Sequence, residues 1–149
     1  MSFQIRPAAQ ADQPLITAMV RAAGINPFSL HWPRFRVAEE GGRVVGVAQI
    51  KLHGDASREL ASLAVVPDRQ GEGIGGALIW HLLDQPEGQP PLFLMCRDEL
   101  QGYYARFGFR RVERGEMPPY FCRMTRVAAV FMAIAARFGE QRHVIVMRR

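Results

Sequence analysis

LASLAVVPDRQGEGIGGALI, residues 60–79, joins an apolar strand-like run to an apolar helix-like run through a glycine-rich turn. Four of the six residues from Gly71 to Gly76 are glycines, which lets the backbone approach a ligand closely. The following helix adds unpaired N–H donors and the positive end of its dipole, and both favour a bound anion. The stretch therefore predicts a cradle for a phosphorylated ligand, with pyrophosphate as its natural guest.

The same glycines admit two other interpretations. Gly71, Gly73 and Gly76 satisfy GxGxxG, the dinucleotide-binding fingerprint, and Asp98 lies 22 residues past Gly76, where a ribose-binding acid could sit. However, residues 67–70 separate the strand from the first glycine, and antiparallel strands are predicted before it, so this interpretation is disfavoured. A glycine-rich turn that only starts the helix is the third alternative.

The remaining sequence predicts a mixed sheet with helices on it. Paired apolar runs around Gly41 and Gly42 indicate an antiparallel hairpin, and Asp12 is placed to cap the first helix. The fold class is therefore α+β (mixed α/β), with about seven strands in a mostly antiparallel sheet and an extra helix between the last two strands. We expect strands at 3–6, 35–40, 43–52, 58–66, 91–96, 109–113 and 143–147, and helices at 11–23, 73–83, 98–107 and 118–138.

Length and composition narrow the class of protein. With 149 residues, of which 48% are hydrophobic and 22% charged, the chain is expected to form a single domain over residues 1–149. It has no signal-peptide pattern at its start and no run of 18 apolar residues, so a cytoplasmic protein without integral membrane association is expected. Cys96 and Cys122 are expected to be free thiols, with Cys96 in the core.

Charge and histidine placement exclude two kinds of site. The net charge of +5 suits polyanionic ligands, and 18 of the 19 basic residues are arginines. No dense basic run with interleaved aromatic residues is present, so no nucleic-acid partner is expected. The four histidines, His31, His53, His81 and His143, are scattered without metal-ligand spacing, so no metal site is expected.

Two motifs carry a resemblance to a known family. The element Q/R-x-x-G-x-G/A is matched by Gln70, Gly73 and Gly75, and YxxxGF is matched from Tyr104 to Phe109. Both have the expected spacing and lie on the expected elements, so the chain resembles the GNAT superfamily of acetyl-CoA-dependent N-acetyltransferases. The resemblance is firmest from residue 59 to residue 109.

The resemblance implies how acetyl-CoA, the cosubstrate, would be held. In that family the pantetheine arm pairs with the backbone of the strand before the cradle, and the cradle N–H groups hold the pyrophosphate. Many members carry an asparagine where this chain has Arg97, which could contact a cofactor phosphate or lie on the surface. The matching cofactor-binding residues are Leu63, Ala64, Val65, Gln70, Gly71, Glu72, Gly73, Ile74, Gly75, Gly76 and Arg97.

The resemblance also implies two catalytic roles. Tyr104 matches the tyrosine that protonates the departing thiolate, and a tyrosine pKa of about 10 against about 8.5 for a thiol makes that transfer nearly balanced. A packed aromatic residue is the alternative role. Glu59 matches a glutamate that serves some members as the general base, and strand alternation places it on the face of Leu63 and Val65. A solvated edge residue, with deprotonation through water, is the alternative for Glu59.

The acceptor is left open by the sequence. A primary amine is expected, either on a small molecule or on a peptide or protein. The helix at 118–138 is expected to pack against its own sheet, with a wall of the acceptor pocket, a homodimer contact and a membrane surface as alternatives. The predicted function is N-acetyl transfer, and the alternative is a catalytically silent acyl-CoA-binding or sensing module of the same fold.

Overall fold

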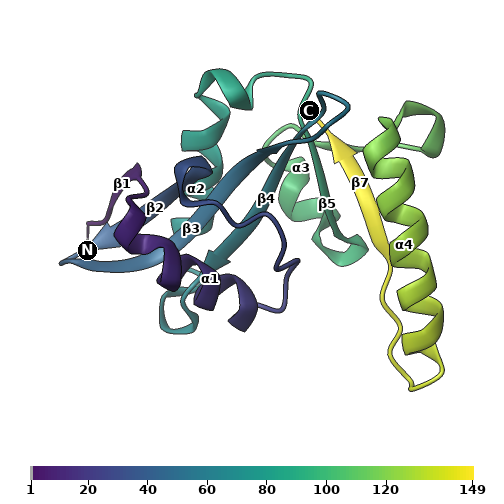
Figure 1. The fold of residues 1–149 in the computed structure, drawn as a ribbon, viewed down its shortest axis with the longest axis horizontal. Helices are drawn as coiled ribbons and strands as arrows, with labels where there is room; N and C mark the ends of the chain where they lie inside the picture. Colours follow the sequence, from purple (N-terminus) through teal and green to yellow (C-terminus); the bar gives the residue numbers. More distant parts are fainter. Residues whose placement is uncertain (1) are drawn as a thin grey trace. The chain divides into compact units, whose positions relative to one another are not determined.

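The computed structural model describes residues 2–149 and contains four α-helices and seven strands, joined by short 3₁₀ turns (Figure 1). The helices are short except for the last one. The elements are β1 Gln4–Pro7, α1 Gln13–Ala22, β2 Phe35–Glu40, β3 Arg43–Leu52, β4 Arg58–Val65, α2 Ile74–Leu83, β5 Phe93–Arg97, α3 Gln101–Ala105, β6 Arg110–Arg111, α4 Pro119–Ala136 and β7 Val144–Arg148.

The strands form one mixed sheet in the order β1-β2-β3-β4-β5-β7-β6. The pairs β1–β2, β2–β3, β5–β7 and β6–β7 are antiparallel, whereas β4 pairs with β5 in parallel through Glu59 and Phe93. The predicted fold class and the mostly antiparallel sheet are confirmed. By its internal contacts the chain divides into two compact units, and the single domain over 1–149 stays a prediction.

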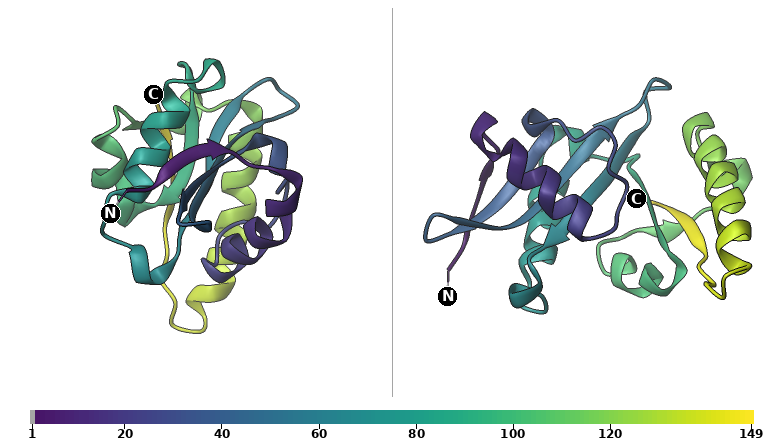
Figure 2. Two further views of the ribbon diagram at one scale, coloured as in Figure 1. Left: turned by 90° about the vertical axis from the view of Figure 1, so that its left-hand side faces the viewer. Right: turned by 60° about the horizontal axis from the view of Figure 1, so that its bottom comes forward.

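Unit 1, which comprises residues up to Lys51 and Leu60–Gln89, holds the first strands with a helix on each face (Figure 2). Side chains of α1 pack against β2, β3 and β4 in a core that includes Ile16, Val37 and Val47. The opposite face receives α2 at Gly46, where a Cβ would lie 2.9 Å from the Ile74 side chain. The absent side chain at this glycine therefore lets α2, and with it the cradle, lie directly on the sheet.

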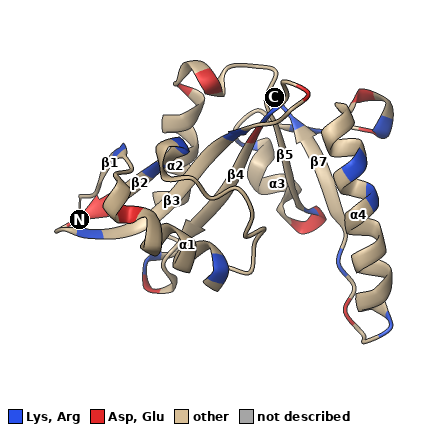
Figure 3. Ribbon diagram, viewed as in Figure 1, with Lys and Arg blue, Asp and Glu red and all other residues tan. Residues whose placement is uncertain are grey.

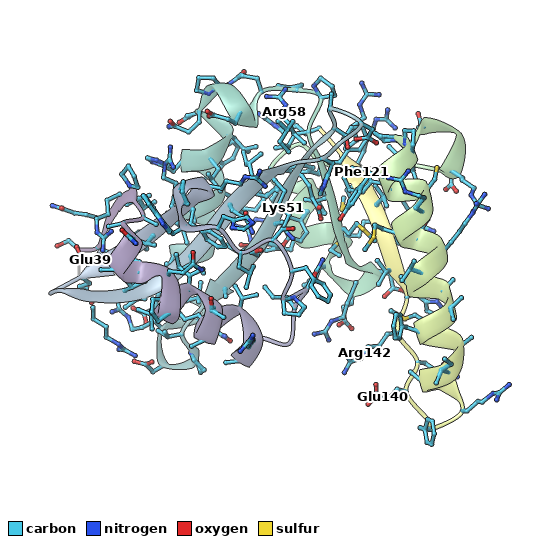
Figure 4. All side chains as sticks on the ribbon, viewed as in Figure 1. Glu39, Lys51, Arg58, Phe121, Glu140 and Arg142 are labelled. Carbon is cyan, nitrogen blue, oxygen red and sulfur yellow. The ribbon has the colours of Figure 1, made fainter. Side chains whose placement is uncertain are left out.

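Unit 2, which comprises Leu52–Glu59 and Pro90–Arg149, repeats this arrangement around β5, β7 and β6. On one face α4 packs through Phe121, which is fully buried against Phe93 with ring centroids 5.2 Å apart (Figure 4). On the other face, Cys96 Sγ lies 3.9 Å from Met147 Sδ. In the right-hand view of Figure 2, β7 runs between α3 and α4.

Helix α4 is present as predicted, but most of its apolar surface does not pack on the sheet. Phe121 is buried, whereas Phe131 is 68% exposed and Phe138, just past the helix, is 82% exposed. The exposed apolar side chains recur three or four residues apart, so they form a stripe beside the packed face, and the charged residues of the helix are arginines (Figure 3). The exposed stripe comprises Val127, Val130, Phe131, Ile134 and Phe138.

Two local predictions are wrong for identifiable reasons. The strand expected at 109–113 is only Arg110–Arg111, because the chain enters a 3₁₀ turn at Arg114 soon after Val112 N–H bonds Val146. Helix α1 begins at Gln13 without a side-chain cap from Asp12. The Asp12 carboxylate instead accepts hydrogen bonds from Arg6 at 2.8 Å and from the Ala9 N–H at 2.7 Å.

Candidate functional site

The glycine-rich cradle lies in unit 1 between β4 and α2. Gly71 and Gly73 adopt left-handed backbone conformations, with φ of 81° and 84°, and Gly73 immediately precedes the helix. A Cβ built at either glycine would meet no atom within 4 Å, so the space in front of the loop is open to a ligand. Within residues 2–149, the backbone N–H groups of Gly71, Glu72 and Gly73 have no intramolecular acceptor.

Ion pairs between Arg69 and two glutamates hold the loop in place and neutralise the Arg69 charge. Arg69 donates to Glu40 on β2 and to Glu72 in the loop, the latter at 2.9 Å, and these hydrogen bonds raise the pKa of its guanidinium. Gln70 holds the end of β4 through its amide, which donates to Val65 O at 3.1 Å. Because Arg69 is neutralised by two carboxylates, an anion would be bound by backbone N–H groups and the helix dipole.

These features fit a pyrophosphate group. The loop offers unpaired donors, a helix N-terminus and open space, and the four glycines keep side chains out of the way. The loop backbone from Gln70 to Gly76 therefore forms the cradle, whereas the side chain of Ile74, another predicted cofactor residue, is buried against the sheet.

The strand that leads into the cradle contains an irregularity that sequence alternation did not anticipate. Ser62, a non-glycine residue, has a left-handed φ of 58°, and its hydroxyl accepts a hydrogen bond of 2.8 Å from the Gln49 amide. The regular alternation used to place Glu59 on the face of Leu63 and Val65 therefore breaks at Ser62. Ala64, between the last two, is buried in the α1 core of unit 1.

Glu59 lies in unit 2, where it forms a buried pair with a histidine. His53 Nε2 and Glu59 Oε1 are 2.8 Å apart, and each side chain is only 11% exposed. The imidazole stacks on the Tyr120 ring with centroids 3.4 Å apart and an angle of 13°, and it lies nearly perpendicular to the Phe121 ring at a centroid distance of 5.8 Å. One ring nitrogen and one face of the His53 ring therefore have fixed neighbours.

Backbone contacts hold this group in place. His53 closes the turn between β3 and β4, with its N–H donating to Ser57 O and its carbonyl accepting from Ala56 N–H, both at 2.9 Å. Asp55 accepts from the Ser57 N–H and, at 2.9 Å, from the Tyr120 N–H at the start of α4. Burial acts to raise the pKa of Asp55, but hydrogen bonds from Ser57 and Tyr120 outweigh it and lower that pKa to about 2. The charged Asp55 carboxylate therefore links the turn to the start of α4 through hydrogen bonds.

Tyr104 lies on α3 in unit 2, in an aromatic setting. Its ring meets Tyr103 edge-on at 5.1 Å and Phe109 at 6.3 Å. Burial raises the pKa of the Tyr104 phenol, with smaller contributions from Cys96 and Tyr103. The phenol therefore keeps its proton throughout the physiological range and acts as a hydrogen-bond donor. Proton transfer to a thiolate is less balanced than the free tyrosine pKa suggests.

Arg97 and Cys96 occupy the end of β5. Arg97 is exposed, and its guanidinium pairs with Glu99 at 3.4 Å, so no geometry here singles it out for a phosphate. Cys96 is buried beneath α3, and this burial raises the pKa of its thiol to about 11. The Cys96 thiol is therefore a core group and a poor nucleophile.

The two predicted catalytic residues have different neighbours in unit 2. Glu59, through His53, contacts Tyr120 and Phe121, which belong to the α4 face together with Phe93. Tyr104 interacts electrostatically with Cys96, whose side chain points to the other face because it is an odd number of residues from Phe93 along β5. Glu59 therefore belongs to the α4 face, whereas Tyr104 interacts with Cys96, whose side chain points away from that face.

Other features of the described residues do not add a site. A cavity of about 520 Å³ lies between α4 and residues 140–144 and contains none of the predicted site residues. Within residues 2–149, no group of three or more His, Cys, Asp or Glu side chains is placed to hold a metal ion. None of the helices in that range combines the length and apolarity that crossing a membrane requires.

Comparison with known proteins identifies the family. A sequence model of the acetyltransferase (GNAT) domain matches residues 31–111, which is more than half of the chain. The chain belongs to the GNAT acetyltransferase family. A curated relative, the amino-acid acetyltransferase of Neisseria meningitidis, is 30% identical over 125 residues, covering 76% of this chain and 29% of the relative.

Solved GNAT structures agree with this assignment. N-acetylglutamate synthase from Neisseria gonorrhoeae, complexed with coenzyme A and N-acetyl-glutamate, is 26% identical, with a TM-score of 0.75 over 99% of this chain and 35% of that chain. The ribosomal-protein-S18-alanine N-acetyltransferase of Escherichia coli shares the fold at 21% identity, with a TM-score of 0.68 over 99% of this chain and 92% of that chain. This chain spans less than a third of its curated relatives' length.

Sequence reasoning about this GNAT chain missed two residues of the Glu59 cluster. His53 was considered only as a metal ligand, and Tyr120 fell within the helix expected at 118–138 without a role of its own. The 67-residue gap between them hides their contact, since one closes a hairpin and the other opens α4. The available signal was weak: His53 lies six residues before Glu59, across a predicted turn.

Proposed function

We propose that this GNAT protein transfers an acetyl group from acetyl-CoA to a primary amine by direct nucleophilic attack. The observation that carries the proposal is the cradle, with unpaired N–H groups and left-handed glycines at the N-terminus of α2. Gly71, Gly73 and their neighbours would hold the pyrophosphate, and the backbone of Leu63–Val65 would align the pantetheine arm. When bound, acetyl-CoA supplies an activated thioester carbon.

Unit 2 supplies groups suited to both proton transfers. The amine must lose a proton before its lone pair can attack, and the Glu59–His53 pair offers a buried base for that proton. The thiolate that departs when the C–S bond breaks needs a proton, and the Tyr104 phenol can donate one.

A free amino acid is the first acceptor class to test. The curated relatives are named amino-acid acetyltransferases, and a solved relative is complexed with N-acetyl-glutamate. On the α4 face, Arg148 lies 5.9 Å from the Phe93 ring centroid, and Arg123 acts electrostatically on Tyr120. These guanidinium groups suit the carboxylate of an amino acid whose amine is near His53 and Glu59.

The test combines cofactor binding with turnover. Acetyl-CoA should raise the melting temperature, and thiol release should follow the addition of one or more members of a panel of amino acids, other small amines and peptides. Tyr104→Phe should keep the cofactor-dependent thermal shift and lose most turnover, while Tyr103→Phe is the matched control. An absent thermal shift would refute the proposed cofactor, and equal activity of Tyr104→Phe and wild type would refute the acid role.

The second candidate function is a catalytically silent acyl-CoA-binding module. The raised pKa of Tyr104 supports this binding role, since a phenol that holds its proton firmly can donate a hydrogen bond to sulfur without protonating it. In that case acetyl-CoA would stabilise the protein, while the whole amine panel would give no thiol release.

A further inference from the structure

Glu59 is the residue that the family resemblance suggests as a possible general base, but its carboxylate already has a partner. The oxygen Oε1 is occupied by His53 Nε2 at 2.8 Å, and Glu59 is 8% exposed. With Nε2 facing a carboxylate, the consistent tautomer carries the ring proton on Nε2 and leaves the lone pair on Nδ1. Within residues 2–149, no hydrogen-bond donor reaches His53 Nδ1.

The imidazole is held in the manner that a base requires. Glu59 fixes its Nε2, the Tyr120 ring covers one face, and the Phe121 ring packs against it in a T-shaped arrangement. Asp55 ties the turn that carries His53 to the backbone N–H of Tyr120. Many enzymes activate a nucleophile with a histidine base that a carboxylate orients. The carboxylate selects the histidine tautomer and stabilises the imidazolium that forms.

We propose that His53 is the proton acceptor for the substrate amine and that Glu59 is its positioning residue. This inference rests on the proposed N-acetyltransferase function. The ammonium substrate gives one proton to His53 Nδ1, and the nitrogen lone pair then forms the bond to the acyl carbon. The C–S bond breaks with its electron pair going to sulfur, and sulfur takes a proton from Tyr104. His53 then passes its proton to solvent. As the amide forms, its nitrogen loses a second proton, which returns through water to the Tyr104 phenolate.

The experiment compares paired variants of the full chain in thiol release. His53→Gln should lower kcat/KM by about 100- to 1,000-fold with little change in KM, the size expected for loss of a general base. Glu59→Gln should lose less, because its amide oxygen still accepts the Nε2 proton. His143→Gln, an exposed histidine outside this cluster, is the matched control and should match wild type. The opposite ranking, with Glu59→Gln nearly inactive and His53→Gln active, would overturn the inference.

Chemical rescue separates this role from a structural one. His53→Ala leaves an imidazole-sized space between the Glu59 carboxylate and the Tyr120 ring, so added imidazole should restore turnover saturably. Rescue should be absent in Glu59→Gln. Melting temperatures are measured for every variant, and activity losses that only follow lost stability, without rescue, would overturn the inference.

The pH profile supplies a further readout that a structural role would not move. The groups facing His53 are Glu59 from β4, Asp55 from the turn, and Tyr120 with Arg123 beyond it from α4. In His53→Gln, the rate should rise tenfold per pH unit over the range where the free amine population rises, because the substrate must lose its proton unaided. An unchanged profile would count against the inference. Silence of wild type and His143→Gln with every amine would instead refute the proposed function itself.

Discussion

Gly73 offers the sharpest test of the cradle, because the structure contains a matched control. Gly73 and Gly42 have φ of 84° and 80°, and a Cβ at either position would meet no atom within 4 Å. Gly42 lies in the turn between β2 and β3, whereas Gly73 opens α2. Alanine at either position therefore adds the same backbone strain and the same free methyl group, and only one of the two methyl groups faces the proposed pyrophosphate.

The expected magnitudes follow from this geometry. A left-handed alanine costs roughly 1–2 kcal/mol, partly offset by about 0.4–1 kcal/mol from the less flexible unfolded chain. Both variants should therefore melt about 2–4 °C below wild type. Gly73→Ala should also lose at least one hydrogen bond to a charged phosphate, worth roughly 1.5–3 kcal/mol, so its Kd for coenzyme A should rise about 10- to 150-fold.

Isothermal titration with coenzyme A, alongside thermal unfolding, measures both quantities. Gly42→Ala should bind coenzyme A like wild type despite its lower melting temperature. The cradle assignment fails if the two variants have the same Kd. It also fails if Gly73→Ala binds as tightly as wild type, since backbone N–H groups behind a methyl group could not then be the ligands.

Two further predictions concern unit 2. Phe121→Ala should lower the unfolding free energy by about 3–5 kcal/mol, whereas Phe131→Ala should change it by no more than about 0.5 kcal/mol, because only the Phe121 side chain is buried. Urea unfolding measures both values. Equal losses would contradict the assigned faces of α4. Asp55 has a folded pKa of about 2, below its unfolded value, so its stabilisation is present above about pH 4 and disappears as pH falls through about 2. The melting-temperature gap between wild type and Asp55→Asn should therefore close near pH 2. A gap independent of pH would contradict stabilisation by the charged Asp55 carboxylate.

Local chemistry in the sequence was enough for the cradle and the element order. A run of glycines between apolar strand and helix patterns has few structural solutions, because left-handed conformations such as those of Gly71 and Gly73 disfavour residues that carry a Cβ. The strand and helix periods likewise predicted the seven strands and the long helix α4, since these periods depend on neighbours only two to four residues away. The predicted ends of the elements were less accurate: the Asp12 carboxylate accepts a hydrogen bond from Arg6, six residues earlier, instead of capping α1.

Tertiary structure alone decided the faces and the partners. The left-handed Ser62 breaks the alternation of β4, and nothing in the sequence around it requires that conformation. The stacking of His53 on Tyr120 joins two residues far apart in sequence, and pairwise contacts of this kind depend on how a turn and a helix start pack together. The sequence by itself determined the glycine-rich loop and was enough to propose its class of ligand, because a phosphate cradle is built from the backbone of one continuous segment. The environment of Glu59 was decided by the fold, because a side-chain cluster depends on segments that only packing brings together.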